Sequence, residues 1–292
     1  MINYSYACIN MTLQSQDIYT GRSMIQKTFK ERGLAYVSSL SLQNVKDLKK
    51  IIEWNILNGF QLFRVSSDIF PWNSEYEYSQ LKDYHEIAKI LLEIGTLCKI
   101  HNHRLSFHPD HFNKLGSPDM FTMSKALRDI EQHSRIFDLM GFEPIRYNKI
   151  NIHIGGSYDD KIKTMRRFCD NFKLLSTNAQ KRLTVENDDK LAMYSVKELF
   201  HGVYEQIGIP IVFDYHHHLF NNGDLSEEEA FCMAYLTWGD MAPVFHYSES
   251  AKDKNPRAHS DYVLNSPNCY GRDINVIVEA KMKELAAFKL KT

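Results

Sequence analysis

The sequence Ile209-Pro210-Ile211-Val212-Phe213-Asp214-Tyr215-His216-His217-His218 runs from an apolar segment directly into a carboxylate and three imidazoles. Its apolar part is typical of a buried strand in a parallel sheet. Other short apolar runs end in side chains of the same chemical kind, at His108, His153, Glu186 and His246. Because packing does not require separate strands to end in metal-ligating groups, the recurrence indicates a shared site.

Strand-like and helix-like segments alternate along the whole sequence. The clearest helical pattern places Ile87, Ile90, Leu91, Ile94 and Leu97 at i, i+3, i+4, i+7 and i+10. We predict strands at 3–9, 61–65, 104–107, 149–154, 182–185, 210–213, 243–245 and 275–278. Further helices are predicted at 42–57, 122–140, 159–175, 195–206 and 226–237, and after the last strand.

Eight strands separated by helices are what a (β/α)8 barrel requires, whereas an open doubly wound sheet usually has fewer strands. No linker rich in Gly, Pro or Ser and no low-complexity tract divides the sequence. The prediction is therefore an α/β fold in which residues 1–292 form a single TIM-barrel domain.

Composition limits the classes of function. The net charge is −1, from 35 basic and 36 acidic side chains, so attraction to a polyanion would depend on a local patch. Five cysteines without a Cys-x-x-Cys pair argue against a disulfide framework and a cysteine zinc cluster, and predict an intracellular location. We expect no membrane association, because no apolar run approaches the length of a bilayer span.

The loops after the strands of a (β/α)8 barrel meet at one face, so residues at different strand ends become neighbours. The candidate ligands are His108, His153, Glu186, Asp214, His217, His246 and Glu279 at strand ends, and His259 in a loop. A lone histidine is more often structural, but convergence favours a metal role. Strand alternation would turn His216 and His218 away from His217, which leaves them supporting or surface roles.

Imidazole and carboxylate together suit Mn²⁺, Zn²⁺ or Fe²⁺ better than Mg²⁺, and this many ligands exceed the four of one tetrahedral site. We therefore predict two or three divalent ions. Adjacent ions of this kind stabilise the attacking and leaving oxygens of a phosphoryl displacement, so phosphodiester hydrolysis is the leading hypothesis. Aldose–ketose isomerisation, or binding of damaged DNA without cleavage, are the alternatives.

Several motifs together resemble those of the UV damage endonuclease (UvdE) family, whose barrels are related to endonuclease IV and xylose isomerase. The motifs are Tyr6-Ala7-Cys8-Ile9-Asn10, Arg64-Val65-Ser66-Ser67-Asp68, Ser106-Phe107-His108-Pro109, Asn151-Ile152-His153-Ile154-Gly155-Gly156, Glu186-Asn187-Asp188, Asp214-Tyr215-His216-His217 and Ala258-His259-Ser260-Asp261-Tyr262. The resemblance covers nearly the whole chain.

The resemblance implies a DNA repair endonuclease, acting as a monomer on double-stranded DNA. It would hydrolyse the phosphodiester 5′ to ultraviolet photoproducts and other lesions, using Mn²⁺, with Zn²⁺, Co²⁺ or Mg²⁺ as alternatives. It implies metal ligation by the eight candidates above, and we assign Glu186, His246 and Glu279 to catalysis. It also implies that Tyr6 and Asn10 line a pocket for flipped-out bases.

The DNA-contact candidates are a probing pair after His108-Pro109 and basic residues expected on loops. The basic residues are Arg64, Lys114, Lys252, Lys254 and Arg257. Three positions depart from the family pattern. The probing pair is His111-Phe112 where Gln-Tyr is usual, Glu75 stands where a histidine ligand is expected, and Val244 replaces a lysine near the metals.

Overall fold

Eight parallel strands form one sheet in the computed structural model of the chain, which describes residues 1–110, 112–251 and 255–291. The strands are β1 (Ile2–Ala7), β2 (Leu62–Val65), β3 (Arg104–Phe107), β4 (Ile150–Ile152), β5 (Leu183–Glu186), β6 (Ile211–Val212), β7 (Val244–Tyr247) and β8 (Ile274–Val278). Their order in the sheet is β6-β5-β4-β3-β2-β1-β8-β7. His111, Lys252 and Lys254, which were predicted to face DNA, lie outside the described residues.

The two end strands of this order, β6 and β7, meet and close the sheet. A parallel bridge joins Asp214 to His246, and the His246 N–H donates to the carbonyl of Phe213 at 3.0 Å. A closed ring of eight parallel strands surrounded by helices is a (β/α)8 barrel. The predicted fold is confirmed.

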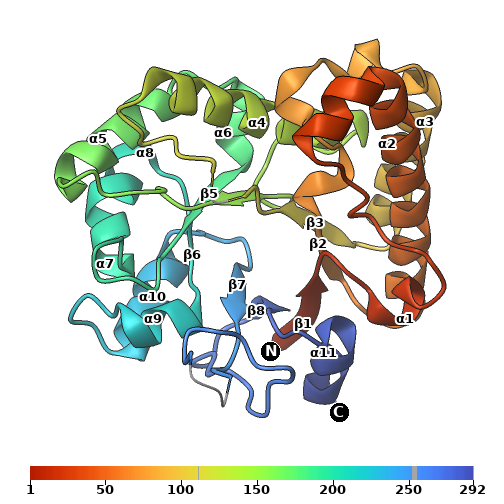
Figure 1. Cartoon of the computed structure of the whole chain (residues 1–292). Coiled ribbons are helices and arrows are strands. Elements are labelled where there is room, and N and C mark those ends of the chain that lie inside the picture. The colour runs from red at the N-terminus through yellow and green to blue at the C-terminus, as the bar shows by residue number, and fades with distance from the viewer. Residues whose placement is uncertain (111, 252–254, 292) are drawn as a thin grey trace.

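Helices surround the barrel (Figure 1). The longer ones are α2 (Gln26–Leu57), α3 (Tyr84–Ile100), α4 (Met120–Leu139), α5 (Lys161–Phe172), α10 (Glu227–Leu236) and α11 (Lys283–Lys291). The short ones are α1 (Met11–Gln14), α6 (Thr177–Arg182), α7 (Val196–Leu199), α8 (Glu205–Ile207) and α9 (Tyr215–Phe220). Single turns are η1 (Ser67–Ile69), η2 (Asn73–Glu75) and η3 (Tyr78–Gln80), and η4 (Phe200–Tyr204) is a π-helical segment. Within the described ranges, no helix combines the length and apolar character needed to cross a bilayer.

Helix α3 follows the predicted periodicity. Ile87, Leu91 and Ile94 are at most 1% exposed, because residues three and four apart share the face that packs on the barrel. The helix predicted at 42–57 is only the second part of α2. Gly33 has a φ of 59°, a conformation open to glycine, and it separates an additional N-terminal segment from the predicted part.

The three histidines after β6 lie in helix α9, so the strand alternation expected for them is wrong. The Asp214 carboxylate accepts the N–H of His217 at 2.8 Å, which is the geometry of a helix N-cap. Successive helical side chains are about 100° apart, so His216 and His218 point away from His217 for a helical reason. Both are buried, and Nε2 of His216 lies 3.3 Å from the carbonyl oxygen of Arg257.

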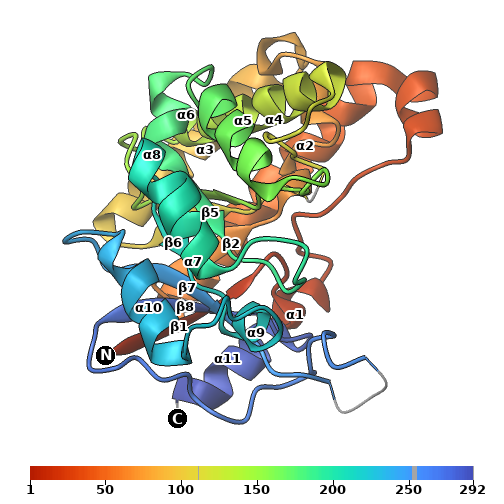
Figure 2. The same ribbon diagram turned by 90° about the vertical axis from the view of Figure 1, so that its left-hand side faces the viewer.

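The ends of the strands gather at one end of the barrel. Figure 1 looks onto this end, and Figure 2 shows from the side that α1 and α9, which follow β1 and β6, are both at this end of the barrel. Side chains that follow different strands therefore converge, as the sequence predicted.

His103, just before β3 and away from this end, links burial in the core to the pH dependence of stability. Its ring is 1% exposed, and neither nitrogen has a hydrogen-bond partner among the described residues. Burial lowers the pKa of His103 from 6.5 to about 4. The unfolded chain therefore takes up a proton between pH 6.5 and 4 that the folded chain does not, and stability is lost as the pH falls through that window.

We predict that the unfolding free energy of the wild type falls by about 3 kcal/mol from pH 6.5 to pH 4 because of His103, and that His103→Leu lacks this fall. Denaturant unfolding at a series of pH values measures this. His101→Leu is the matched control, because His101 is exposed and two residues away, and its profile should follow the wild type. Parallel curves for the wild type and His103→Leu would contradict the prediction.

Candidate metal centre

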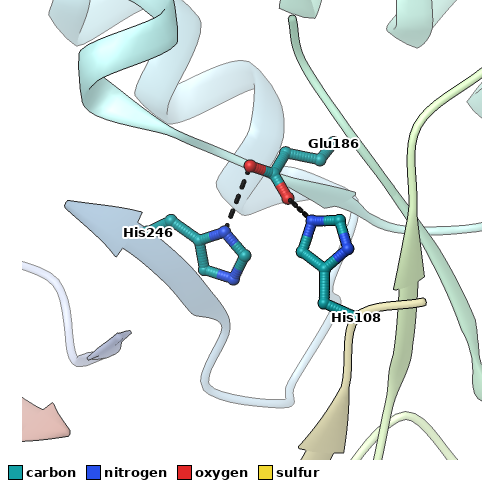
Figure 3. Close-up of side chains that lie close together, drawn as sticks. All are labelled: His108, Glu186 and His246. Carbon is teal, nitrogen blue, oxygen red and sulfur yellow. Dashed lines mark hydrogen bonds and ion pairs between the residues drawn. The ribbon is translucent and has the colours of Figure 1, made fainter. Parts of the chain in front are cut away.

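The carboxylate of Glu186 lies at the centre of the converging side chains. Glu186 is the last residue of β5, and its side chain is 1% exposed. One oxygen, Oε2, is 3.0 Å from Nε2 of His108, and the other, Oε1, is 3.1 Å from Nδ1 of His246 (Figure 3). The carboxylate is thus held between rings from the ends of β3 and β7.

Two further groups share atoms with this first one. His153 and His217 approach Glu186 to 4.0 Å and 3.6 Å, and Glu279 lies 3.3 Å from Nδ1 of His246. The three groups are His108, Glu186 and His246; His153, Glu186 and His217; and Asp214, His246 and Glu279. In each group the potential ligand atoms lie within 4.8 Å of one another.

These residues fit a divalent metal. Nε2 of His246 and the Oδ2 atom of Asp214 are buried without a hydrogen-bond partner among the described residues. Buried polar atoms are normally paired, so atoms of this kind aimed at one another are the arrangement that ligation completes. The donor set is imidazole and carboxylate, which suits Mn²⁺, Fe²⁺ or Zn²⁺.

The histidines of the centre divide into two electrostatic types. Burial lowers the pKa of His108, and it lowers that of His246 to about 4, so both rings are neutral at pH 7. Burial also disfavours the charged form of His153, but Asp188 and Glu186 outweigh it and raise its pKa to about 10. The pKa of His217 is likewise raised, by Asp214 and Glu186 against the effect of burial.

The carboxylates differ as well. Burial raises the pKa of Asp214 to about 7, and Glu186 and Glu279 add to this effect. Burial acts in the same direction on Glu279, but Arg64 and His246 outweigh it and lower its pKa. At pH 7 and without metal, the centre therefore retains a proton on His153 and partly on Asp214 that divalent ions would displace.

Two asparagines that sequence reasoning left without a role fix the ligands. The Asn151 amide donates to Oε2 of Glu186, and its oxygen accepts from Thr184 Oγ1 at 2.9 Å. The Asn187 side chain clasps the backbone of Asp214, with distances of 2.8 Å and 3.0 Å. The signal was present in the sequence, because Asn151 is a polar residue between the two isoleucines of β4 and Asn187 directly follows Glu186 at the end of β5.

Asp188 is a third residue that the prediction missed. Its Oδ1 atom lies 3.2 Å from Nδ1 of His153, the ring nitrogen that faces away from Glu186. A carboxylate behind a ligating histidine orients the ring and raises its basicity. Asp188 belongs to a motif quoted above, but only the fold shows which ring it contacts.

Two of the predicted ligands stand apart. Nδ1 of His259 is 3.9 Å from Oε2 of Glu279, so this ring adjoins the centre without joining the three groups. Glu75 lies in η2 and forms a 3.1 Å ion pair with Lys125 of α4, and it belongs to none of the groups found among the described residues. The lysine provides its counter-charge, so Glu75 is not placed as a ligand.

The predicted DNA contacts lie in different environments. Arg64 is in β2 and not on a loop as predicted, and its guanidinium pairs with Glu279 inside the barrel. Arg257 is on a loop, with 48% of its side chain exposed, and forms a 3.1 Å ion pair with Asp189. Phe112 is 71% exposed.

Tyr6 and Asn10 are fully buried. The Tyr6 hydroxyl accepts from the Asn10 amide at 2.8 Å and donates to Asn55 at 2.6 Å, and Asn10 also caps α1. A contact with a flipped-out base would require these bonds to open, so their role in lesion binding stays a prediction.

Comparison with known proteins decides the family. The family model of UV-endonuclease UvdE matches residues 2–292. The chain belongs to the UvdE family. It is 35% identical to the UV-damage endonuclease of Schizosaccharomyces pombe over 98% of its own length, and spans about half (49%) of that relative. The predicted family is confirmed, and it is one of DNA repair endonucleases.

Solved structures agree with the barrel assignment. The crystal structure of SacUVDE has a TM-score of 0.86 and 30% sequence identity, with 99% of this chain and 96% of that chain covered. Endonuclease IV from Thermus thermophilus has a TM-score of 0.59 at 13% identity, with 99% and 96% covered. The second likeness is one of fold alone.

We predict that Asp188→Asn lowers the pKa of His153 in metal-free UvdE-family protein, by about one unit or more, because the nearest carboxylate loses its charge. NMR titration of the histidine rings in the presence of a chelator measures this. Asp189→Asn is the neighbouring control, since Asp189 pairs with Arg257 instead. An unchanged pKa of His153 would show that Asp188 does not act on it.

Proposed function

We propose that this chain is a UV-damage endonuclease that hydrolyses the phosphodiester on the 5′ side of ultraviolet photoproducts, and of other lesions that unstack the duplex. The observation that carries the proposal is the set of three overlapping donor groups centred on Glu186. Family membership supports the substrate class. A monomer in the intracellular space, acting on double-stranded DNA, is part of the proposal.

The cluster would hold two or three divalent ions, with Mn²⁺ as the first candidate. When bound, such ions stabilise charge on the attacking and leaving oxygens of a phosphoryl displacement. His108 and His246 are suited to ligation, because their lowered pKa leaves a lone pair available at neutral pH. Glu186 would link the groups, and His246 and Glu279 would complete the reacting side of the cluster.

Arg64 prepares the centre for an anionic substrate. Its guanidinium pairs with Glu279 and keeps its charge whether or not metal is bound, whereas the proton on His153 is lost when a divalent ion takes that ring. The Arg64 charge offsets one carboxylate, so a phosphate faces a less anionic surface. The overall net charge of −1 makes such local compensation necessary.

Lesion recognition would involve Phe112, an exposed aromatic that follows the β3 ligand His108 by four residues. It lines a cavity of about 560 Å³ together with Trp72 and Phe121. A damaged dinucleotide is poorly stacked and costs less to extrude, and an inserted ring replaces the lost stacking. Selectivity for damage over sequence follows from this difference in cost.

We predict that Glu186→Gln lowers nicking by roughly 100-fold or more, since even residues behind metal ligands contribute 10- to 100-fold. The assay is conversion of ultraviolet-irradiated supercoiled plasmid to open circles with Mn²⁺, alongside unirradiated plasmid. Glu205→Gln, at an exposed glutamate of α8, is the control and should nick normally. Circular dichroism checks the fold.

The outcomes of the plasmid assay separate the alternatives. Wild-type protein that binds irradiated DNA without nicking it, across Mn²⁺, Mg²⁺, Zn²⁺ and Co²⁺, would select a damage-binding barrel. Conversion of aldoses to ketoses without nicking would select an isomerase. An end-labelled duplex with one photoproduct tests the position of the cut, and a product ending directly 5′ to the lesion is expected.

We predict that Phe112→Ala weakens binding to a photoproduct duplex by about tenfold, because one stacked ring contributes about 1–3 kcal/mol. Binding to undamaged duplex should change little. Phe112→Tyr keeps the ring and is the matched control. Equal losses on damaged and undamaged duplex, measured by fluorescence anisotropy, would assign Phe112 to general DNA contact instead.

A further inference from the structure

Lys149 is a buried lysine beneath the metal centre. Its carbonyl accepts the N–H of Phe107 at 2.9 Å, which extends the pairing of β3 and β4 by one residue. Asn151, two residues later, reaches Glu186, and side chains two residues apart on a strand point to the same face. The Lys149 side chain therefore enters the barrel interior one layer below the ligands.

Packing alone does not explain why an ammonium group is buried at Lys149. The side chain is fully buried, and Nζ has no hydrogen-bond partner in the part of the chain that is described. An unpaired buried amine is costly, and the interior of a (β/α)8 barrel is usually filled by branched apolar side chains. A compensating interaction is required.

The compensation comes from the ligand carboxylates. Burial lowers the pKa of Lys149 to about 7, and Glu186 and Glu279 oppose that fall. Two other buried cations that act on Lys149 are already engaged: Arg64 pairs with Glu279, and Arg104 donates to the carbonyls of Tyr147 and Ala242 at 2.9 Å and 2.8 Å. Lys149 also acts electrostatically on His246.

We propose that Lys149 is a positioning residue that acts as an internal counter-charge, stabilising the metal-free ligand cluster and weakening its hold on divalent ions. The inference rests on the proposed function, in that the cluster must bind such ions. Without metal and below its pKa of about 7, the Lys149 ammonium group attracts the carboxylates of Glu186 and Glu279. With metal, two kinds of cation compete for the same carboxylates in a medium of low dielectric.

A counter-charge and a packing residue predict opposite changes in metal affinity when Lys149 is replaced. Loss of a packing residue destabilises the protein with and without metal and leaves affinity unchanged or reduced. Loss of a counter-charge destabilises only the metal-free form and tightens metal binding. The gain in thermal stability on adding metal therefore becomes larger.

The test compares wild-type protein with Lys149→Met, which keeps a long flexible side chain and removes the charge. Calorimetric titration of chelator-treated protein with Mn²⁺, at a pH below 7 where Lys149 is charged, should give about three- to tenfold tighter binding for the variant. Thermal unfolding should show a lower Tm without Mn²⁺ and a larger rise on its addition. Lys163→Met, at an exposed lysine of α5, is the matched control and should behave as wild type.

The possible failures are distinguishable. Wild-type protein that binds none of Mn²⁺, Zn²⁺, Co²⁺ and Mg²⁺ would overturn the proposed metal centre itself. Wild-type binding together with equal or weaker binding by Lys149→Met would overturn the role of Lys149 alone. Lys149→Gln gives a second neutral variant.

A measurement on the wild type covers the case in which neither variant folds. In protein labelled with ¹⁵N-lysine, addition of diamagnetic Mg²⁺ or Zn²⁺ should shift the ¹⁵Nζ signal of the buried lysine and leave signals of exposed lysines in place. A buried-lysine signal that does not move while the metal binds would overturn the proposal.

Discussion

The arrangement of the barrel end depends on the buried carboxylate of Glu186. An anion that is 1% exposed must be compensated, and its partners come from the ends of β3, β4 and β7 and from α9. No two of these elements are adjacent in the sequence, so only the closed barrel brings them together. The donor groups therefore form only when the barrel is closed.

The junction of β6 and β7, here called the seam of the barrel, shows how closely the fold and the donor groups are linked. β6 and β7 join through the bridge between Asp214 and His246, and both residues belong to the same donor group. Asn187 holds the backbone of Asp214, and the N-cap of α9 fixes His217 relative to that carboxylate. Movement at the seam would thus displace ligands from three elements at once.

Much of this arrangement was predictable because it depends on local patterns. Apolar runs with a polar residue at the end specify a buried strand and its functional end together, which is why seven predicted ligands fall into the three groups. The helical stripe of α3 needs only local spacing. The family motifs added the substrate class, which no pattern of hydrophobicity contains.

The failures arose where a tertiary partner decides the outcome. The short helix α9 depends on the cap by Asp214. Arg64 was predicted to contact DNA from a loop because it is basic. It lies in β2, and its partner is Glu279 across the barrel interior. In each case the residue type was visible and the contact was not.

The positions that depart from the family pattern bear on the charge that the centre offers to metal ions. Glu75 is engaged elsewhere, and Val244 is a fully buried apolar side chain two residues before His246, where the resemblance implies a lysine. The three groups contain three carboxylates, Glu186, Asp214 and Glu279, and Arg64 already pairs with one of them.

Buried charge without compensation is costly. Arg64 pairs with Glu279, and the buried Lys149 side chain lies beneath the ligands, so both reduce the negative charge that the carboxylates offer to metal ions. The interior cations of this chain thus act on the same quantity as its ligands, which is the charge that the centre can hold.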